Sequence, residues 1–274
     1  MRPIPTSFHL GPLEVHTYGV GLAITFWFAY RYFEKRLEKR GFPTDWVASM
    51  FIWVIVAAIA GARIMHVASN WSFYSSHPAD ILAIWHGGLS SFGGLILAVP
   101  VALFVAHKRC PELGILQGLD IVAPVLLAAW ALGRILGPQL MVAGGGHETH
   151  QWFGMYYDGQ VGPRVPVPVI QAIEDFLTYL ILIFIERKVD ARRADSPPGT
   201  IPYGTVVGTA MIIWGFTRGL DEHLLLGQDG ALGSMLVQLA SVGLIIGGAL
   251  ILLHVRRRWG HSPAGDPAAP LSTR

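Results

Sequence analysis

The stretch "SMLVQLASVGLIIGGALILL", residues 234–253, contains no charged residue. A helix needs about 20 apolar residues to cross a bilayer core of ~30 Å, so this stretch predicts a membrane-spanning helix. Similar apolar segments lie at about 17–33, 47–68, 89–107, 117–141, 169–186 and 202–220. The sequence therefore predicts an all-α, polytopic integral membrane protein with about seven transmembrane helices.

The composition of the chain agrees with this class. The 274 residues are 52% hydrophobic and only 14% charged, with a mean hydropathy of +0.47, whereas a soluble domain carries about 25% charged residues. With one cysteine, Cys110, no internal disulfide is possible, and we expect a bystander thiol. The N-terminus lacks a signal-peptide pattern, so the first apolar segment is expected to stay as an anchor.

Basic residues between the apolar segments predict the orientation of the chain. They cluster in the loops at 31–40, 107–112 and 186–199 and at the start of the tail, 256–258. The intervening loops hold a single basic residue, Arg164. Because Lys and Arg accumulate on the cytoplasmic side, this alternation predicts an N-terminus outside and a C-terminus in the cytoplasm.

The boundaries of the domain follow from the same segments. Residues 1–258 are predicted to form a single transmembrane domain. The Gly-, Pro- and aromatic-rich stretch at about 142–168 is expected to form an outer cap or loop. The Pro- and Ala-rich residues 259–274 are expected to form a disordered cytoplasmic tail.

Three arginines, Arg63, Arg134 and Arg218, fall toward the outer ends of apolar segments. An arginine in the middle of the bilayer costs at least ~2.5–3.5 kcal/mol. A single one could snorkel to the interface, but three on one side favour a shared anionic ligand. A guanidinium suits a phosphate, and the abundant phosphate of a membrane is the phospholipid headgroup. Glu222 lies four residues after Arg218, where it either neutralises that arginine or orients it toward the ligand.

A glycine-rich stretch, "WHGGLSSFGGL" at residues 85–95, begins the third segment. Exposed N–H groups of such a backbone form anion sites, so we expect a lipid headgroup to meet a bend here. The residues of this stretch expected to bind substrate are Gly87, Gly88, Ser90, Gly93 and Gly94. His86 is either an interfacial polar residue or part of the chemistry. His16 and Tyr18 lie at the outer mouth of the first helix.

In the order of its motifs, the chain resembles the prolipoprotein diacylglyceryl transferase family. The similar motifs are "HTYG" at 16–19, "GAR" at 61–63, His77-Pro78 followed by the glycine-rich stretch, "DIVAP" at 120–124 with Gly133-Arg134, "PVPVIQA" at 166–172, Gly199-Thr200, "WGFTRGLDE" at 214–222 and "QLAS" at 238–241. The glycine-rich stretch is the most specific of them.

The resemblance implies a reaction on the outer face of the bacterial cytoplasmic (inner) membrane. The diacylglyceryl group of phosphatidylglycerol moves to the lipobox cysteine thiol of a prelipoprotein, a thioether forms, and glycerol 1-phosphate leaves. It implies no metal, no organic cofactor and no nucleic-acid partner. By resemblance, Arg134 and Arg218 hold the phosphate, Glu222 positions Arg218, and Tyr18 lines the pocket. His16, Arg63 and Gly133 are expected among the substrate-binding residues.

The chain departs from the family pattern at several polar positions. Phe92 replaces a histidine, Trp214 a tyrosine and Gln171 a glutamate, and no Asn/Glu signature follows Arg134. Two replacements for the lost histidine are open: His86, as a catalytic residue, or His147 and His150 of the outer loop. The sequence "HETH" at 147–150 is only a weak metal signal, because no third ligand is evident.

Two alternative functions stay open at this level. A divergent paralogue could bind phosphatidylglycerol and be inactive, or use another acceptor. An anion transporter is the other possibility, but the arginines cluster on one side instead of lining a path, and no paired broken helices are evident.

Overall fold

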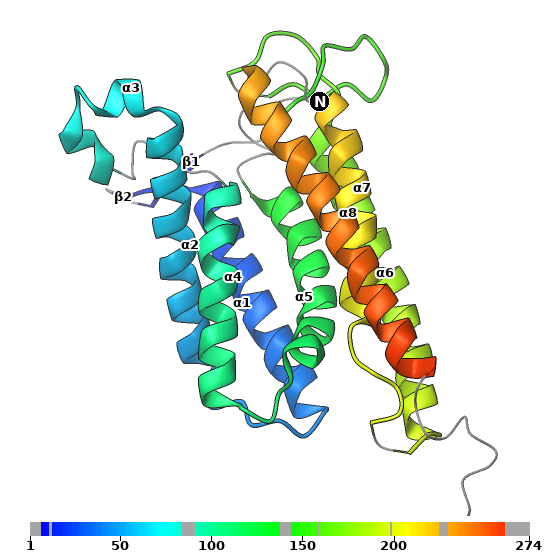
Figure 1. The fold of residues 1–274 in the computed structure, drawn as a ribbon. Coiled ribbons are helices and arrows are strands. Elements are labelled where there is room, and N and C mark those ends of the chain that lie inside the picture. The colour runs from blue at the N-terminus through cyan, green and yellow to red at the C-terminus, as the bar shows by residue number, and fades with distance from the viewer. Residues whose placement is uncertain are drawn as a thin grey trace, which may run out of the picture. The chain divides into compact units, whose positions relative to one another are not determined.

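The structure, a computed structural model, describes residues 7–10, 13–83, 91–137, 144–157, 159–197, 199–224 and 230–260. Seven long helices stand out within these ranges (Figure 1). They are α1 (Thr17–Glu38), α2 (Val47–Ser69), α4 (Ser91–Arg109), α5 (Ile115–Leu136), α6 (Val167–Ala194), α7 (Thr205–Leu224) and α8 (Gly230–Gly260). Two shorter helices, α3 (Trp71–Tyr74) and η1 (Pro78–Leu82), follow α2.

The long helices coincide with the seven predicted segments, so the helical fold class is confirmed. One element was not expected. Strands β1 (Ser7–Leu10) and β2 (Leu13–His16) form an antiparallel hairpin in which Ser7 pairs with His16. The Gly-Pro pair between two short runs that contain apolar residues is a turn signal that could have revealed it.

Four helices are long and apolar enough to cross a membrane: α2, α5, α6 and residues Val237–Trp259 of α8. Large apolar side chains on the long helices, including Trp27, Ile52, Phe104 and Leu250, are more than half exposed. Apolar exposure on this scale is untypical of a soluble monomer and fits helices that face lipid. The number of seven crossings and the direction of the termini stay predictions.

The chain divides into two compact units, residues 34–115 (unit 2) and residues 1–33 with 116–274 (unit 1). In unit 2, α2 packs along α4 (Figure 1). A methyl group in place of a hydrogen on Gly93 would lie 2.3 Å from the carbonyl oxygen of Gly61, and one on Gly61 would lie 2.3 Å from that of Gly93. A methyl group on Gly94 would lie 3.2 Å from the carbonyl oxygen of Ala58, a less severe approach. The second glycine pair of "WHGGLSSFGGL" therefore lies inside α4, where the backbone that approaches it is that of α2.

The only cysteine of the sequence, Cys110, follows directly on α4 in unit 2 and is fully buried. Burial, and then the neighbouring Glu112, raise the pKa of its thiol. Because the thiolate is the reactive form, this buried thiol is unreactive, which agrees with the expected bystander.

The core of unit 1 is built from α5, α6 and α7, which bury an aliphatic cluster including Leu127, Leu182 and Val206. At one end of this core, Asp120 of α5 accepts hydrogen bonds from the backbone N–H groups of Gly204, at 2.8 Å, and Val207, at 2.9 Å. Arg193 of α6 lies 3.7 Å from the same carboxylate. A single carboxylate thus caps the first turn of α7 and joins three helices.

The α2–α4 contact predicts the effect of a larger residue at its centre. We expect Gly93→Val to lower the free energy of unfolding by about 3 kcal/mol, because its side chain would meet rigid backbone. Thermal unfolding of the purified full chain in detergent measures the change. Gly243→Val on α8 is the matched control, since nothing lies within 4 Å of that glycine's added carbon. Equal losses for the two variants would contradict the packing role.

Candidate active site

An ion pair near the end of α7 is the starting point of the site. Arg218 Nη1 lies 3.2 Å from Glu222 Oε2, one helical turn away. The Glu222 side chain is 3% exposed and that of Arg218 is 16% exposed. Both atoms are buried, and neither makes a hydrogen bond within the described part of the chain. The pair predicted from the i, i+4 spacing is therefore present, and its geometry leaves hydrogen-bonding capacity unused.

Trp214, one turn before Arg218 on α7, links three helices. Its ring stacks on that of Trp130 of α5, with 4.6 Å between ring centroids. Its indole N–H donates a hydrogen bond to the carboxylate of Asp175 on α6. The tryptophan therefore still supplies a hydrogen-bond donor at the position where the family pattern has a tyrosine.

Two carboxyl groups meet across α6 and α7. The Glu174 and Asp221 carboxyl groups lie within hydrogen-bonding reach of each other. Gln171, one turn before Glu174 on α6, also hydrogen-bonds Asp221 through its side chain. The amide at position 171 therefore contributes a donor where a second carboxylate would repel Asp221.

Arg134 of α5 completes this group of charges. It interacts electrostatically with Asp175 and Asp221, which attract it, and with Arg218, which repels it. Within unit 1 the structure therefore brings Arg134 and Arg218 near each other. We call Arg134, Asp175, Arg218, Asp221 and Glu222, with Gln171 and Glu174 beside them, the arginine cluster.

The outer loop predicted at about 142–168 attaches to the end of α7. In its described part, residues 144–157 and 159–166, the His147 N–H donates to the carbonyl oxygen of Leu224 at 3.2 Å, and His147 Nε2 lies 3.1 Å from that of His223. Gly145 and Gln160 exchange two hydrogen bonds that close the loop on itself. His147 thus binds the last carbonyl groups of α7, which a helix end leaves without intrahelical partners.

Arg63 belongs to unit 2 and contacts backbone there. Its guanidinium donates to the carbonyl oxygens of Asp80 at 2.5 Å, Ile81 at 2.8 Å and Ala83 at 3.3 Å. It also lies 5.3 Å from the centre of the Tyr74 ring. In this structure the arginine fixes η1 and the residue after it, which directly precede the glycine-rich stretch.

The other predicted site residues fall at several places. His16 ends β2 and Tyr18 lies in the first turn of α1. Gly133 lies on α5 beside Thr25 of α1. His86, Gly87, Gly88 and Ser90 lie outside the described residues.

Sequence reasoning predicted Glu222 but missed the other two buried acids of the cluster, Asp175 and Asp221. Asp175 and Asp221 are 4% exposed, and charged side chains are almost never that buried unless paired. Their signal is present in the sequence, because "IEDF" at 173–176 and "LDEH" at 220–223 place acids within apolar segments. An acid inside a membrane segment suggests a partner of opposite charge.

Comparison with known proteins gives a consistent result. A model of the prolipoprotein diacylglyceryl transferase family matches residues 5–254. A phosphatidylglycerol–prolipoprotein diacylglyceryl transferase of Streptococcus agalactiae is 25% identical over 269 residues, covering 92% of this chain and 96% of that protein. The protein of the same name from Streptococcus equi is 29% identical over 266 residues, covering 94% and 97%.

A further relative of that name, from Lactobacillus acidophilus, is 38% identical over 130 residues, 47% of this chain and 46% of that protein. The full-length matches and the family match span the arginine cluster. The chain therefore belongs to the prolipoprotein diacylglyceryl transferase family.

Proposed function

We propose that this chain transfers the diacylglyceryl group of phosphatidylglycerol to the lipobox cysteine of a prelipoprotein, with the arginine cluster as its phosphate site. The family match and the names of the relatives support the assignment of this reaction. One structural observation supports the site: the buried Arg218 Nη1 forms an ion pair with Glu222 at 3.2 Å but makes no hydrogen bond with any described residue. Buried donors in folded proteins are nearly always satisfied, and a phosphate oxygen would satisfy this one.

The chemistry explains why the site needs cations. A thiolate attacks the glyceryl carbon next to the phosphate ester, a C–S bond forms, and the C–O bond breaks. The C–O electron pair leaves with the phosphate, which changes from a singly charged diester into a monoester with a second negative charge. Arg134 and Arg218 are placed to stabilise the charge that develops there, while Glu222 orients Arg218.

The reaction also needs an acceptor for the thiol proton. His86 is one candidate, from its place in the glycine-rich stretch. The Glu174–Asp221 pair is the second, because it lies in the arginine cluster and Glu174 is only partly buried. A positioned proton acceptor contributes about 10²–10⁴-fold to a rate.

We place the arginine cluster toward the outer face of the bacterial cytoplasmic membrane. In unit 1, the basic ends of α6 and α8, including Arg192, Arg193, Arg257 and Arg258, lie at the end where α7 begins. Arg218 lies near the opposite end of α7. Because basic residues mark the cytoplasmic side, the cluster faces outward, with the N-terminus outside and residues 1–258 as one transmembrane domain.

The proposed site predicts a specific loss of function in cells. We expect the wild-type gene to restore lipidation of a reporter prelipoprotein in bacteria depleted of their own diacylglyceryl transferase. Arg134→Ala and Arg218→Ala should lower lipidation at least ~100-fold, because each removes a cation from the developing phosphate charge. The gel shift of the reporter measures the effect.

Arg187→Ala is the control, since this exposed arginine lies in the basic last part of α6, outside the arginine cluster. Membrane levels of each variant are measured in parallel. Stable wild-type protein without lipidation would overturn the transferase function and favour the paralogue that binds lipid without this reaction. Wild-type activity in Arg218→Ala would overturn the site alone.

The proton acceptor is tested by comparing His86→Gln with Glu174→Gln. We expect the variant that removes the acceptor to lower the transfer rate by about 10²-fold or more. Retention of phosphatidylglycerol by the purified variant should be unchanged, because the acceptor acts on the thiol and not on the lipid. Wild-type rates in both variants would contradict both assignments.

A further inference from the structure

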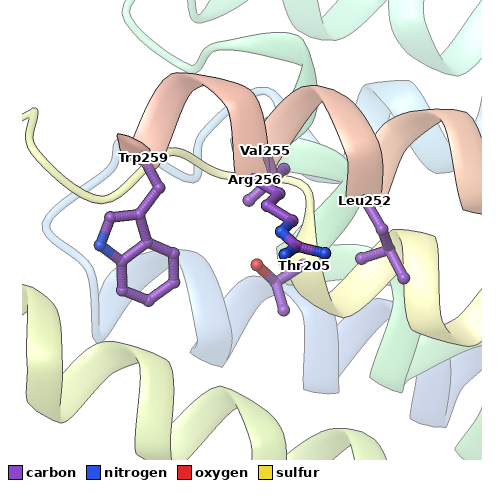
Figure 2. A pocket seen from close by; sticks show the side chains of 5 residues that line it. All are labelled: Thr205, Leu252, Val255, Arg256 and Trp259. Carbon is purple, nitrogen blue, oxygen red and sulfur yellow. The ribbon is translucent and has the colours of Figure 1, made fainter. Parts of the chain in front are cut away.

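A groove lies beside the first turn of α7, at the end of unit 1 far from the arginine cluster. It has a volume of about 520 Å³ and is lined by Thr205, Leu252, Val255, Arg256 and Trp259 (Figure 2). Thr205 and Arg218 are 13 positions apart on α7, which corresponds to about 20 Å along a helix. The groove is therefore a separate feature from the proposed phosphate site.

The lengths of two packed helices create this groove. A methyl group on Gly248 of α8 would lie 2.6 Å from the carbonyl oxygen of Gly208, so the two backbones approach closely there. Helix α7 begins at Thr205, only three residues before Gly208, whereas α8 continues to Gly260. The last turns of α8 therefore extend past the start of α7, and the lining residues lie where the contact ends.

The lining combines apolar walls with a single charge. Leu252, Val255 and the ring of Trp259 are apolar, and Arg256 carries the only formal charge among the lining residues. Figure 2 shows the Arg256 guanidinium beside the Thr205 side chain. Thr205 Oγ1 is buried and makes no hydrogen bond within the described residues. The groove thus offers a cation and an unused hydroxyl next to apolar surface.

The charges around the groove are also positive. Arg192 of α6 lies 5.9 Å from the centre of the Trp259 ring, and Arg257 and Arg258 follow on α8. The nearby carboxylate of Asp120 is already used, because it binds Gly204, Val207 and Arg193. The N–H groups at the start of α7 are therefore already bound by Asp120. The positive charge that a ligand in the groove can contact is that of Arg256.

We infer that this groove binds an anionic phospholipid of the membrane leaflet on that side. The phosphate lies between Arg256 and the Thr205 hydroxyl, an acyl chain lies along Leu252 and Val255, and Trp259 marks the headgroup level, where tryptophan is enriched. The Arg256 guanidinium forms a charge-assisted hydrogen bond with the phosphate, and the arginines around the groove favour a headgroup that carries no compensating cation. The inference does not depend on the transfer reaction.

Native mass spectrometry of the purified full chain tests this site. Phosphatidylserine is the probe, because it is anionic without being the proposed substrate, and phosphatidylcholine is the zwitterionic comparison with no net charge. We expect the wild-type chain to retain phosphatidylserine in preference to phosphatidylcholine. Arg256→Gln should lower phosphatidylserine retention about tenfold, the effect of losing one hydrogen bond to a charged group, and Thr205→Val should lower it less.

Arg258→Gln is the matched control, since it removes the same charge from the same helix outside the groove. Arg218→Ala separates this site from the proposed phosphate site, and both variants should retain phosphatidylserine as the wild type does. Equal losses in Arg256→Gln and Arg258→Gln would overturn the site, as would equal retention of the two lipids by the wild type. Displacement of the lipid by millimolar inorganic phosphate would also overturn it, because it would indicate a site for a free anion.

Discussion

The hydrogen-bonded carboxylate of Asp120 is the constraint on which unit 1 depends. It is 3% exposed and binds two N–H groups at the start of α7 and the guanidinium of Arg193 on α6. A buried carboxylate without partners is costly, so these three helices are held in one register. The same helices carry Arg134, Asp175 and Arg218. The Asp120 contacts at one end of the core therefore help to set which side chains meet at the other end.

The arginine cluster is held by its own carboxylates. Arg218 faces Glu222, and Arg134 is attracted by Asp175 and Asp221. Two cations near each other in a low-dielectric setting repel strongly unless anions separate them. The acids therefore hold the two arginines near each other in unit 1.

Much of the fold could be predicted from the sequence, because a helical membrane segment is recognised by its apolar composition and its length. The seven long helices and the Arg218–Glu222 pair followed from segment length and helical spacing. Contacts between distant segments could not be predicted in this way. Gly93 and Gly94 were expected at a lipid headgroup, and that role stays a prediction. Their contact with α2 is an additional finding, which a run of glycines does not reveal by itself. Asp175 and Asp221 meet Arg134 only because α5, α6 and α7 pack together, which the sequence does not reveal. The backbone contacts of Arg63 in unit 2 are likewise a result of tertiary folding.

The most direct test of the central claim is transfer by the purified chain. The assay combines phosphatidylglycerol labelled in its terminal glycerol with a lipobox peptide, and follows labelled glycerol phosphate and the modified peptide. The account predicts one glycerol phosphate released for each thioether formed, and no release with a peptide whose cysteine is replaced by serine. Release at the same rate with the serine peptide, or no release by protein that binds phosphatidylglycerol, would contradict it.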